Sequence, residues 1–258
     1  MAIHASAIID PKAEIDSSVE IGPFSIVGPD VCIGAGTVVK SHVVINGHTT
    51  IGENNEIFQF ASVGEANQDK KYNGEPTKLI IGDNNVIRES ATLHRGTIQD
   101  NSITMIGNGN LFMACSHVGH DCIVGDNNVF ANYVALAGHV VVGDSVILGG
   151  YTGVHQFCRI SSFSMCGMGS MVNKDIPRYI MVSGEPAKAH GMNFEGMRRR
   201  GMSKGVIKAL RDAYKYVYMK GIKLDVAIQE LEQGLAKEFI EVQYFVDSIQ
   251  QSTRGIIR

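Results

Sequence analysis

Residues 118–148 read VGHDCIVGDNNVFANYVALAGHVVVGDSVIL, and an apolar residue recurs there at every sixth position. The series comprises Val118, Val124, Phe130, Leu136, Val142 and Leu148. The same spacing runs in one phase from Ile3 to Val63, resumes at Ile81, and continues after a slip of one residue from Ile106 to Val172. Glycine, aspartate or asparagine often follows the apolar residue, and the fifth place is usually small. A hexad repeat therefore occupies most of the chain from Ile3 to Val172.

A period of six matches neither the 3.6-residue period of a helix nor the alternation of a half-buried strand. It predicts a solenoid in which each hexad supplies one short flat side and one corner. The apolar residue fills the inside, and Gly, Asn or Asp takes the left-handed corner conformation. Three sides close a triangle, so one coil takes three hexads, and coils stack at a spacing of about 4.8 Å. Chance enrichment of Ile and Val would not hold one phase over so many repeats.

Two segments interrupt the hexads. Residues 65–78, EANQDKKYNGEPTK, are polar and predict a loop ejected from the coil, and the slip near residues 99–105 predicts a smaller bulge. Beyond Pro177 the apolar residues take helical spacing, with Ser203 placed as a helix N-cap. We therefore expect a mainly β protein, with a β-helix over residues 1–185 and a C-terminal α-helical domain over residues 186–258.

Composition and charge argue against several classes of protein. The net charge of -3 predicts no non-specific binding to nucleic acid, and no apolar run reaches the ~18 residues of a membrane span. The N-terminus shows no basic segment followed by an apolar stretch, so we expect no signal peptide. The five cysteines form no CxxC pair, which indicates reduced core residues of a cytoplasmic protein rather than a zinc cluster.

Five of the nine histidines fall within one part of the repeat: His94, His117, His120, His139 and His155. Any one of them alone is compatible with an exposed corner that has no function. Steps of one full coil, however, lead from His120 to Gly138 and on to Gln156. Asp121 sits next to His120, His139 next to Gly138, and His155 next to Gln156. We therefore expect a stripe of His, Gln and Asp on one wall of the solenoid.

Two kinds of chemistry fit this stripe. Neutral imidazoles are common metal ligands. One imidazole can instead act as a general base while a backbone amide stabilises an oxyanion. Because a corner between His117 and His120 would splay their rings apart, general-base catalysis without metal or cofactor is the favoured interpretation. A metal site is the alternative.

Several sequence motifs are specific to one family. The hexads, together with six segments, closely resemble the UDP-N-acetylglucosamine O-acyltransferase family of lipid A biosynthesis. The segments are HVGHDC (117–122), LAGHV (136–140), VHQFC (154–158), QDKKYNGEPT (68–77), NFEGMRRRG (193–201) and STRGIIR (252–258). The resemblance runs essentially end to end. It implies a left-handed parallel β-helix with a C-terminal helical domain, assembled as a homotrimer with active sites between subunits.

The resemblance also implies a reaction and a set of residue roles. A (3R)-3-hydroxyacyl group would pass from acyl carrier protein to the glucosamine 3-hydroxyl of UDP-N-acetylglucosamine, the first step of lipid A biosynthesis. By motif position, His120 would be the general base, Asp121 would orient or polarise it, and Gly138 would supply an oxyanion-hole N–H. The substrate-binding residues would be Asp69 and Lys71 for the sugar nucleotide, His94, His117, His139, His155 and Gln156 for the sugar and acyl pocket, and Asn193, Glu195, Arg199 and Arg200 for the uridine and phosphate end.

The chemistry of the reaction supports these roles. A sugar hydroxyl is too weakly acidic to attack unaided, so a neutral imidazole is a suitable base. Attack on a thioester builds negative charge on the carbonyl oxygen, and a corner glycine lets a backbone donor approach closely. Direct transfer in a ternary complex needs no Ser or Cys nucleophile.

The resemblance further implies that Met168 closes the far end of the acyl groove. His120 and Met168 occupy the same place in hexads that are eight repeats apart, or two and two-thirds coils, which corresponds to about 13 Å along the solenoid axis. At about 1.3 Å per carbon, about ten carbons fit. The alternative is that Met168 is a flexible filler on the outer wall.

Three rival functions fit parts of the sequence. The N-acyltransferase of the same pathway carries an additional N-terminal uridine-binding domain, for which hexads beginning at Ile3 leave no room. A γ-type carbonic anhydrase would use zinc held by histidines of a trimer, but it would not need the ejected loop or the Arg-containing tail. A non-catalytic scaffold would keep its function after replacement of His120 by Ala.

Overall fold

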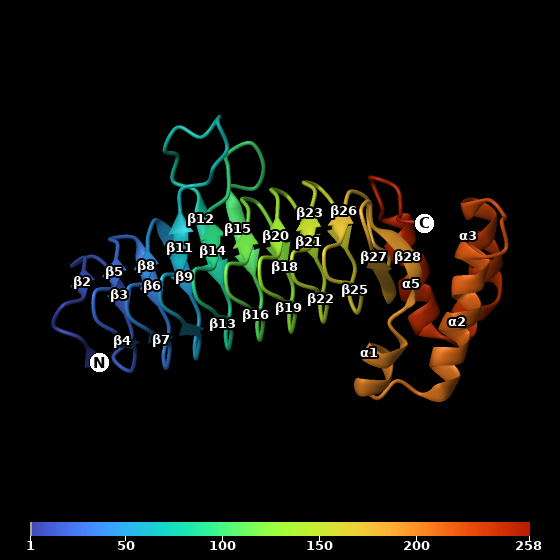
Figure 1. Ribbon diagram of the computed structural model, residues 1–258, viewed down its shortest axis with the longest axis horizontal. Helices are drawn as coiled ribbons and strands as arrows, with labels where there is room; N and C mark the ends of the chain where they lie inside the picture. The colour runs from blue at the N-terminus through green and yellow to red at the C-terminus, as the bar shows by residue number, and fades with distance from the viewer. Residues whose placement is uncertain (1) are drawn as a thin grey trace.

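The hexads form the walls of a long coil in the computed structural model, which describes residues 2–258 (Figure 1). Each hexad supplies one short strand and one corner. The second residue of the strand points inward, so Val118 and Leu136 are fully buried, whereas the first residue, such as Ala135, faces outward. The strands stack into three long sheets and give a left-handed parallel β-helix, which confirms the expected fold class.

The three sheets, named A, B and C, contain 11, 9 and 8 strands. Sheet A consists of β1 (Ala2–Ile3), β4 (Glu20–Ile21), β7 (Val38–Val39), β10 (Glu56–Ile57), β13 (Val86–Ile87), β16 (Leu111–Phe112), β19 (Val129–Phe130), β22 (Ile147–Leu148), β25 (Met165–Cys166), β27 (Ile180–Ser183) and β28 (Lys188–Met192). Sheet B consists of β2 (Ile8–Ile9), β5 (Ile26–Val27), β8 (Val44–Ile45), β11 (Ser62–Glu65), β14 (Thr92–His94), β17 (His117–Val118), β20 (Ala135–Leu136), β23 (Gly153–Val154) and β26 (Met171–Val172). Sheet C consists of β3 (Glu14–Ile15), β6 (Val31–Ile33), β9 (His48–Ile51), β12 (Lys78–Ile81), β15 (Ile103–Ile106), β18 (Ile123–Val124), β21 (Val141–Val142) and β24 (Arg159–Ile160).

Strand partners in regular coils are three hexads apart, as the repeat predicts. Val118 pairs with Leu136, and Leu136 pairs with Val154. All three side chains lie inside the coil and are at most 4% exposed. Because the register is fixed at three hexads, corner residues also stack, and functional groups at equivalent places in successive coils become neighbours.

The corners differ from the expectation in one respect. The left-handed backbone conformation falls on the third residue after the inward apolar residue, and Tyr133 and Tyr151 (φ 61° each) adopt it as well as Asn127. A glycine directly after the inward residue has another cause. A Cβ on Gly119 would lie 2.9 Å from the carbonyl carbon of Ala137 in the next coil. Close stacking of the coils, rather than the left-handed conformation, therefore requires glycine at position 119.

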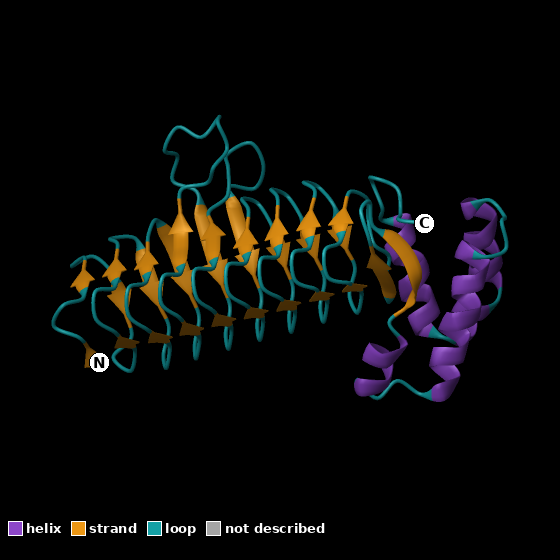
Figure 2. Ribbon diagram, viewed as in Figure 1, coloured by secondary structure: helices purple, strands orange, loops and turns teal. Residues whose placement is uncertain are grey.

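Two loops leave the coil side by side (Figure 2). The first, residues 66–77, joins β11 to β12, and the second, residues 95–102, joins β14 to β15. They lengthen the offset between strand partners, because Ile57 pairs with Ile87, five hexads on, and Leu93 pairs with Val118, four hexads and one residue on. The second offset exceeds the regular one by one hexad plus one residue. The loop at 95–102 therefore explains the slip in the hexad phase.

Helices follow the last coil. They are α1 (Phe194–Arg199), α2 (Lys204–Tyr218), α3 (Leu224–Gln233), α4 (Leu235–Glu238) and α5 (Ile240–Gln250). The predicted N-cap is confirmed, because the Ser203 hydroxyl accepts a hydrogen bond from the Val206 N–H at 3.2 Å. Within residues 2–258 none of the helices has the length and apolarity that a bilayer crossing requires.

A buried carboxylate ties the end of the chain back to the coil. Asp175 is 2% exposed and accepts hydrogen bonds from the Arg159 N–H (2.8 Å), the Ser252 hydroxyl (2.7 Å) and the Thr253 N–H (3.0 Å). In addition, the Ile257 N–H donates to the Asp175 carbonyl at 2.9 Å. The STRGIIR segment thus fastens the helices to the last coil.

Candidate active site

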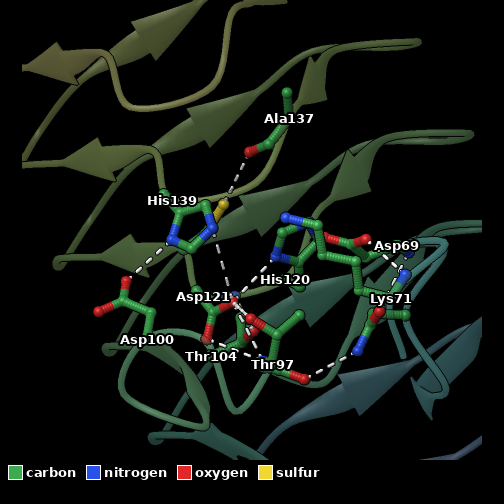
Figure 3. A network of polar contacts seen from close by, with 12 residues as sticks. Asp69, Lys71, Thr97, Asp100, Thr104, His120, Asp121, Ala137 and His139 are labelled. Atoms are coloured by element: carbon green, nitrogen blue, oxygen red, sulfur yellow. Dashed lines mark hydrogen bonds and ion pairs between the residues drawn. The ribbon is translucent and has the colours of Figure 1, made fainter. Parts of the chain in front are cut away.

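A His–Asp pair stands at the corner between sheets B and C (Figure 3). His120 and Asp121 connect β17 to β18, and His120 Nδ1 lies 2.9 Å from Asp121 Oδ2. Asp121 takes the left-handed conformation (φ 58°), and its side chain is fully buried, whereas that of His120 is 15% exposed. The corner thus buries the carboxylate and leaves one edge of the imidazole accessible.

Asp121 is held by two threonines. The Thr97 hydroxyl donates to Oδ2 at 2.6 Å, and the Thr97 N–H contacts both carboxylate oxygens at 2.9 and 3.0 Å. The Asp121 N–H donates to the Thr104 hydroxyl at 2.9 Å. Burial alone would raise the pKa of Asp121, but the hydrogen bonds from His120 and Thr97 outweigh burial, and the pKa is lowered. Asp121 is therefore an anion that can hold an imidazole ring.

Gly138 lies directly against the ring of His120. A Cβ at this position would overlap the imidazole, so any other residue would displace the ring. Among the described residues no acceptor takes the buried Gly138 N–H. The coil-to-coil stacking that the sequence predicts thus brings together the base candidate and a free backbone donor.

His94 and His117 lie on sheet B beside this corner. Their ring centroids are 4.9 Å apart in an edge-to-face arrangement, and His117 Nδ1 lies 2.7 Å from the Thr92 hydroxyl. Burial lowers the pKa of His117 to about 4, and the neighbouring imidazoles of His94 and His120 act in the same direction. Burial is also the main reason why the pKa of His94 is lowered. Near pH 7 both rings are neutral hydrogen-bonding groups.

His139 lies on the other side of Asp121. Its Nε2 is 3.9 Å from Asp121 Oδ2, and its Nδ1 is 2.8 Å from Asp100 Oδ2. The ring also stacks on Phe157 at a centroid distance of 4.4 Å and meets His120 edge to face at 5.0 Å. A carboxylate and a ring stack therefore fix the plane of His139.

The alternative of a metal site has one feature in its favour. Ligand atoms of His120, Asp121 and His139 all lie within 4.8 Å of one another. These atoms are already in use, however, because Asp121 Oδ2 accepts from Thr97 and faces His120, while His139 faces Asp100. A metal ion would have to displace these contacts. The network therefore favours acid–base chemistry.

An apolar groove of about 750 Å³ runs along sheet B, and Ala137, the residue before Gly138, is part of its lining. His117 and His155 contribute to its wall, and the outward residues Ala135, Gly153 and Met171 of successive coils form its floor. Gln156 and His155 are exposed at the corner one coil beyond Gly138, where His155 Nδ1 contacts the Gln156 carbonyl at 3.1 Å. The lining of the groove is mostly apolar, and within residues 2–258 Glu185 is the one carboxylate in it.

Asp69 and Lys71 lie on the loop at 66–77, which is tied to the same network. The Asp69 carboxylate accepts from the Lys71 N–H at 2.9 Å, and the Asp69 N–H donates to Asn67 Oδ1 at 3.1 Å. Asn67 Nδ2 donates in turn to the carbonyl of Gly96 at 2.9 Å. Figure 3 shows Asp69 and Lys71 on the same side of the coil as His120.

The remaining predicted residues lie elsewhere in the chain. Asn193 caps α1, because Oδ1 accepts from the Gly196 N–H at 2.9 Å while Nδ2 donates to the Phe163 carbonyl at 3.1 Å. Glu195 pairs with Arg199 at 3.3 Å, and Arg200 lies over the Phe163 ring at 5.4 Å. Three further strands of sheet B separate the coil of His120 from this end of the molecule (Figure 1). One chain therefore does not bring the NFEGMRRRG segment beside His120.

Met168 and His120 lie at different corners of the coil. Met168 lies between β25 and β26, at the edge shared by sheets A and B, and it is 79% exposed. His120 lies at the edge shared by sheets B and C. Within one chain the two residues are thus separated around the coil as well as along it.

Among the polar residues that contact Asp121 and His139, three were not predicted from the sequence: Thr97, Asp100 and Thr104. Thr97 and Asp100 belong to the segment where the hexad phase slips, so no stacking rule applies to them. The one available signal was the slip itself, because extra residues next to a histidine-rich stripe mark a place where the chain departs from the coil.

A left-handed β-helix with a corner histidine held by a buried carboxylate, next to an apolar groove, defines a hexapeptide-repeat acyltransferase. Comparison with known proteins specifies the family. Residues 175–257 match the family model of UDP-N-acetylglucosamine O-acyltransferase, domain 2. The acyl-[acyl-carrier-protein]--UDP-N-acetylglucosamine O-acyltransferase of Stutzerimonas stutzeri is 57% identical over 208 residues, which are 81% of this chain and 80% of that protein.

Solved structures agree over the whole chain. The UDP-N-acetylglucosamine O-acyltransferase of Moraxella catarrhalis is 54% identical and superposes with a TM-score of 0.98, covering 100% of both chains. The Francisella novicida UDP-N-acetylglucosamine acyltransferase is 41% identical with a TM-score of 0.96, covering 99% of this chain and 94% of that one. The chain belongs to the UDP-N-acetylglucosamine O-acyltransferase family.

Proposed function

We propose that this protein transfers a (3R)-3-hydroxyacyl group from acyl carrier protein to the glucosamine 3-hydroxyl of UDP-N-acetylglucosamine, with His120 as the general base. The observation that carries the proposal is the His120–Asp121 pair set directly against Gly138, with an apolar groove lined by the neighbouring residues His117 and Ala137. The names of the relatives supply the two substrates. The geometry supports the chemical steps proposed below.

The base follows from the hydrogen bonds of the ring. Asp121 occupies the Nδ1 side of His120, which leaves Nε2 to accept the proton of the sugar hydroxyl. The oxygen attacks the thioester carbonyl, the C–O ester bond forms, and the C–S bond breaks. The departing thiolate then takes the proton from the imidazolium. Asp121 stabilises the imidazolium between these two proton transfers.

Gly138 stabilises the charge that develops on the carbonyl oxygen. Its N–H is buried and has no acceptor among the described residues. A preorganised donor of this kind typically contributes about 10²–10³-fold to the rate. The donor and the base come from adjacent coils, so both groups reach one carbonyl. Direct transfer of this kind needs neither a metal nor another cofactor.

The groove along sheet B suits the acyl tail. Its floor is apolar, so burial of each methylene would contribute about 0.8 kcal/mol. The neutral His117 at its start offers a hydrogen-bonding group near the reacting end. Asp69, Lys71, His94, His139, His155 and Gln156 would then contact the sugar and its neighbourhood. The five free thiols suit a reducing compartment, and we place the enzyme in the cytoplasm.

We further infer a homotrimer, because one chain leaves the site incomplete. Asn193, Glu195, Arg199 and Arg200 lie in or beside α1, beyond the last coil and three strands of sheet B away from the coil of His120, so a second copy would have to supply a uridine-binding end. An apolar stripe at the edge of sheets A and B supports packing of copies. Phe24, Phe60, Tyr133 and Tyr151 are each more than half exposed there, and Tyr133 stacks on Tyr151 at 5.0 Å.

Product analysis tests the proposed reaction. Purified protein is incubated with UDP-N-acetylglucosamine and a panel of 3-hydroxyacyl carrier proteins, and the products are identified by mass. We expect a sugar nucleotide that carries one 3-hydroxyacyl group and releases it with hydroxylamine, as an ester does. A hydroxylamine-resistant amide would favour the N-acyltransferase, and no acylated product from any donor would contradict the proposal. Light scattering should give three times the mass of the chain.

A further inference from the structure

The loop at 95–102 contacts three separate parts of the site. Thr97 holds the carboxylate of Asp121, Asp100 holds the ring of His139, and Gly96 accepts a hydrogen bond from Asn67 of the longer loop. Only two strands, β14 and β15, connect this segment to the coil. None of the predicted substrate-binding residues lies on this loop. The loop instead contacts predicted site residues, namely Asp121 and His139.

The loop at 95–102 approaches the Asp121 carboxylate through both Thr97 and Gly96. The backbone N–H of Thr97 and its hydroxyl donate to one carboxylate, with the hydroxyl at 2.6 Å from Oδ2. Oδ2 is the oxygen that faces His120 Nδ1. A Cβ on Gly96 would lie 2.7 Å from Asp121 Oδ1, so the chain approaches the carboxylate without room for a side chain. The position of this loop therefore sets the position of the carboxylate.

The same segment fixes the longer loop. Arg95 Nη2 donates to the Tyr72 hydroxyl at 3.0 Å, and the Arg95 N–H donates to the Glu65 carbonyl at 3.2 Å. Together with the bond from Asn67 to Gly96, these contacts join the loop of Asp69 and Lys71 to the residue next to Thr97. The sugar-nucleotide loop and the base therefore share one support.

We propose that Thr97 is a positioning residue that sets the ring orientation of His120 by holding the Asp121 carboxylate in place. The inference rests on the proposed role of His120 as base. Thr97 acts through Asp121 and touches no substrate. Its hydroxyl also shares Oδ2 with His120, so it withdraws negative charge from the oxygen that stabilises the imidazolium.

Two effects follow from loss of the hydroxyl. The carboxylate gains freedom, so the His120 ring is held less well and kcat falls, while KM for the sugar nucleotide stays the same. More charge also remains on Oδ2 for the imidazolium, so the acid limb of the pH–rate profile moves to higher pH. The substitution leaves the other ionisable groups around His120 and Asp121 unchanged. These groups are His139, which contacts Asp100, together with His117, His94 and Glu65.

The test compares Thr97→Val with Thr97→Ser. Valine keeps the shape and the backbone N–H but removes the hydroxyl, whereas serine keeps the hydroxyl. In the valine variant we expect kcat to fall about tenfold or more, KM to stay within about twofold of the parental value, and the acid limb to shift to higher pH. In the serine variant we expect kcat to stay within about twofold of the parental value. Thr37→Val is the matched control, because it also removes a buried, hydrogen-bonded hydroxyl (Thr37 to the Gly52 carbonyl, 3.0 Å) but in a distant coil. It should alter Tm without altering the pH profile.

A second comparison isolates the route through Asp121. In an Asp121→Asn background, Thr97→Val should have no further effect on kcat. If the valine variant does not fold, Thr97→Ala and Thr97→Ser make the same comparison, since both lack the methyl group and differ in the hydroxyl. Equal kcat in the variants with and without the hydroxyl, or an unmoved acid limb, would overturn the inference. Full turnover by His120→Ala would instead reject the proposed base, and the two failures are thus distinguishable.

Discussion

At the scale of single residues, the environment of each histidine decides what it can do. His120 has a carboxylate at Nδ1, and its side chain is 15% exposed. His117, which lies nearby on β17, is kept neutral by burial, which lowers its pKa to about 4. Identical side chains beside one corner therefore have different environments, which suit the proposed base in one case and a neutral hydrogen-bonding group in the other.

Removal of His120 should abolish most of the turnover. A positioned general base contributes about 10²–10⁴-fold, so kcat of His120→Ala should fall by that factor while the coil stays intact. In the parent, kcat should fall as pH decreases, because a protonated ring cannot accept the hydroxyl proton. Between pH 5 and 8 His117 does not contribute to this limb, since its pKa is about 4.

Steady-state kinetics, which give kcat, and circular dichroism, which reports the fold, test this prediction. His48→Ala is the control, since His48 lies on β9 in sheet C and should leave kcat within about twofold. Near-normal turnover of a folded His120→Ala would exclude His120 as the base.

His117 should make stability depend on pH. In the unfolded chain an imidazole titrates near 6.5, whereas in the folded protein the pKa of His117 is about 4. Between these values the unfolded state binds more protons, so stability is lost as pH falls from about 6.5 to 4. From pH 7 to pH 5 the loss from this residue should be about 2 kcal/mol.

Urea unfolding at pH 7 and pH 5, at one protein concentration, measures this dependence. His117→Asn should lose less stability than the parent over the same interval, because it has no proton to bind. An equal loss in both proteins would show that burial of His117 has no such effect.

At the scale of elements, stacked side chains hold successive coils in register. Asn55, Asn85, Asn110 and Asn128 form a buried column at the corners between sheets C and A. Asn85 Nδ2 donates to Asn55 Oδ1 at 3.0 Å, and Asn85 Oδ1 accepts from the Asn110 N–H at 2.9 Å. Each amide thus satisfies a backbone group that the corner leaves without a strand partner.

Replacement of Asn85 by Ala should therefore be costly. It removes the acceptor of both the Asn110 N–H and the Asn110 side-chain amide in a buried place, and such groups cost about 1–3 kcal/mol each. We expect a loss of about 3 kcal/mol in the free energy of unfolding, measured with urea. Asn132→Ala, at an exposed corner, should change it by less than about 0.5 kcal/mol. Similar values for both variants would mean that the column does not stabilise the coil.

At the scale of the whole molecule, the arrangement of the chain bears on substrate length. Met168 and His120 lie on the two edges that border sheet B, and the apolar groove along that sheet includes Met171, three residues after Met168. The prediction that Met168 limits the acyl chain is therefore a prediction about the far end of this groove. The rise of about 13 Å along the axis still favours about ten carbons.

Met168→Gly should move the preferred donor to a longer 3-hydroxyacyl chain, because it opens the end of the groove. One misfit methylene typically changes specificity by ~10–200-fold, so the change should be evident in kcat/KM across a series of donors. Met219→Ala, another exposed methionine, should keep the parental profile. If Met168→Gly keeps it too, the residue is not the ruler.

The periodic parts of the molecule were predictable because their geometry is local. An inward residue at every sixth position fixes the side length of the coil, and β stacking fixes the register of three hexads, so Gly138 could be placed against His120 by counting. The same rule failed at the corners, where counting does not reveal that Tyr133 and Tyr151 adopt the left-handed conformation. There, contacts with the neighbouring coils rather than intrinsic preference decide the residue type.

The sequence by itself thus determined the coil, the stacking of His120 on Gly138, and the family. Only the tertiary structure decided which groups orient the base. Thr97 and Asp100 reach Asp121 and His139 from 24 and 39 residues away, through a loop whose path follows no repeat. The tertiary structure also decided that α1 lies beyond the last coil and away from His120 of the same chain. The physical reason is that a repeat fixes distances through hydrogen bonds between equivalent residues, whereas the path of an irregular segment depends on all the contacts it makes once the chain has folded.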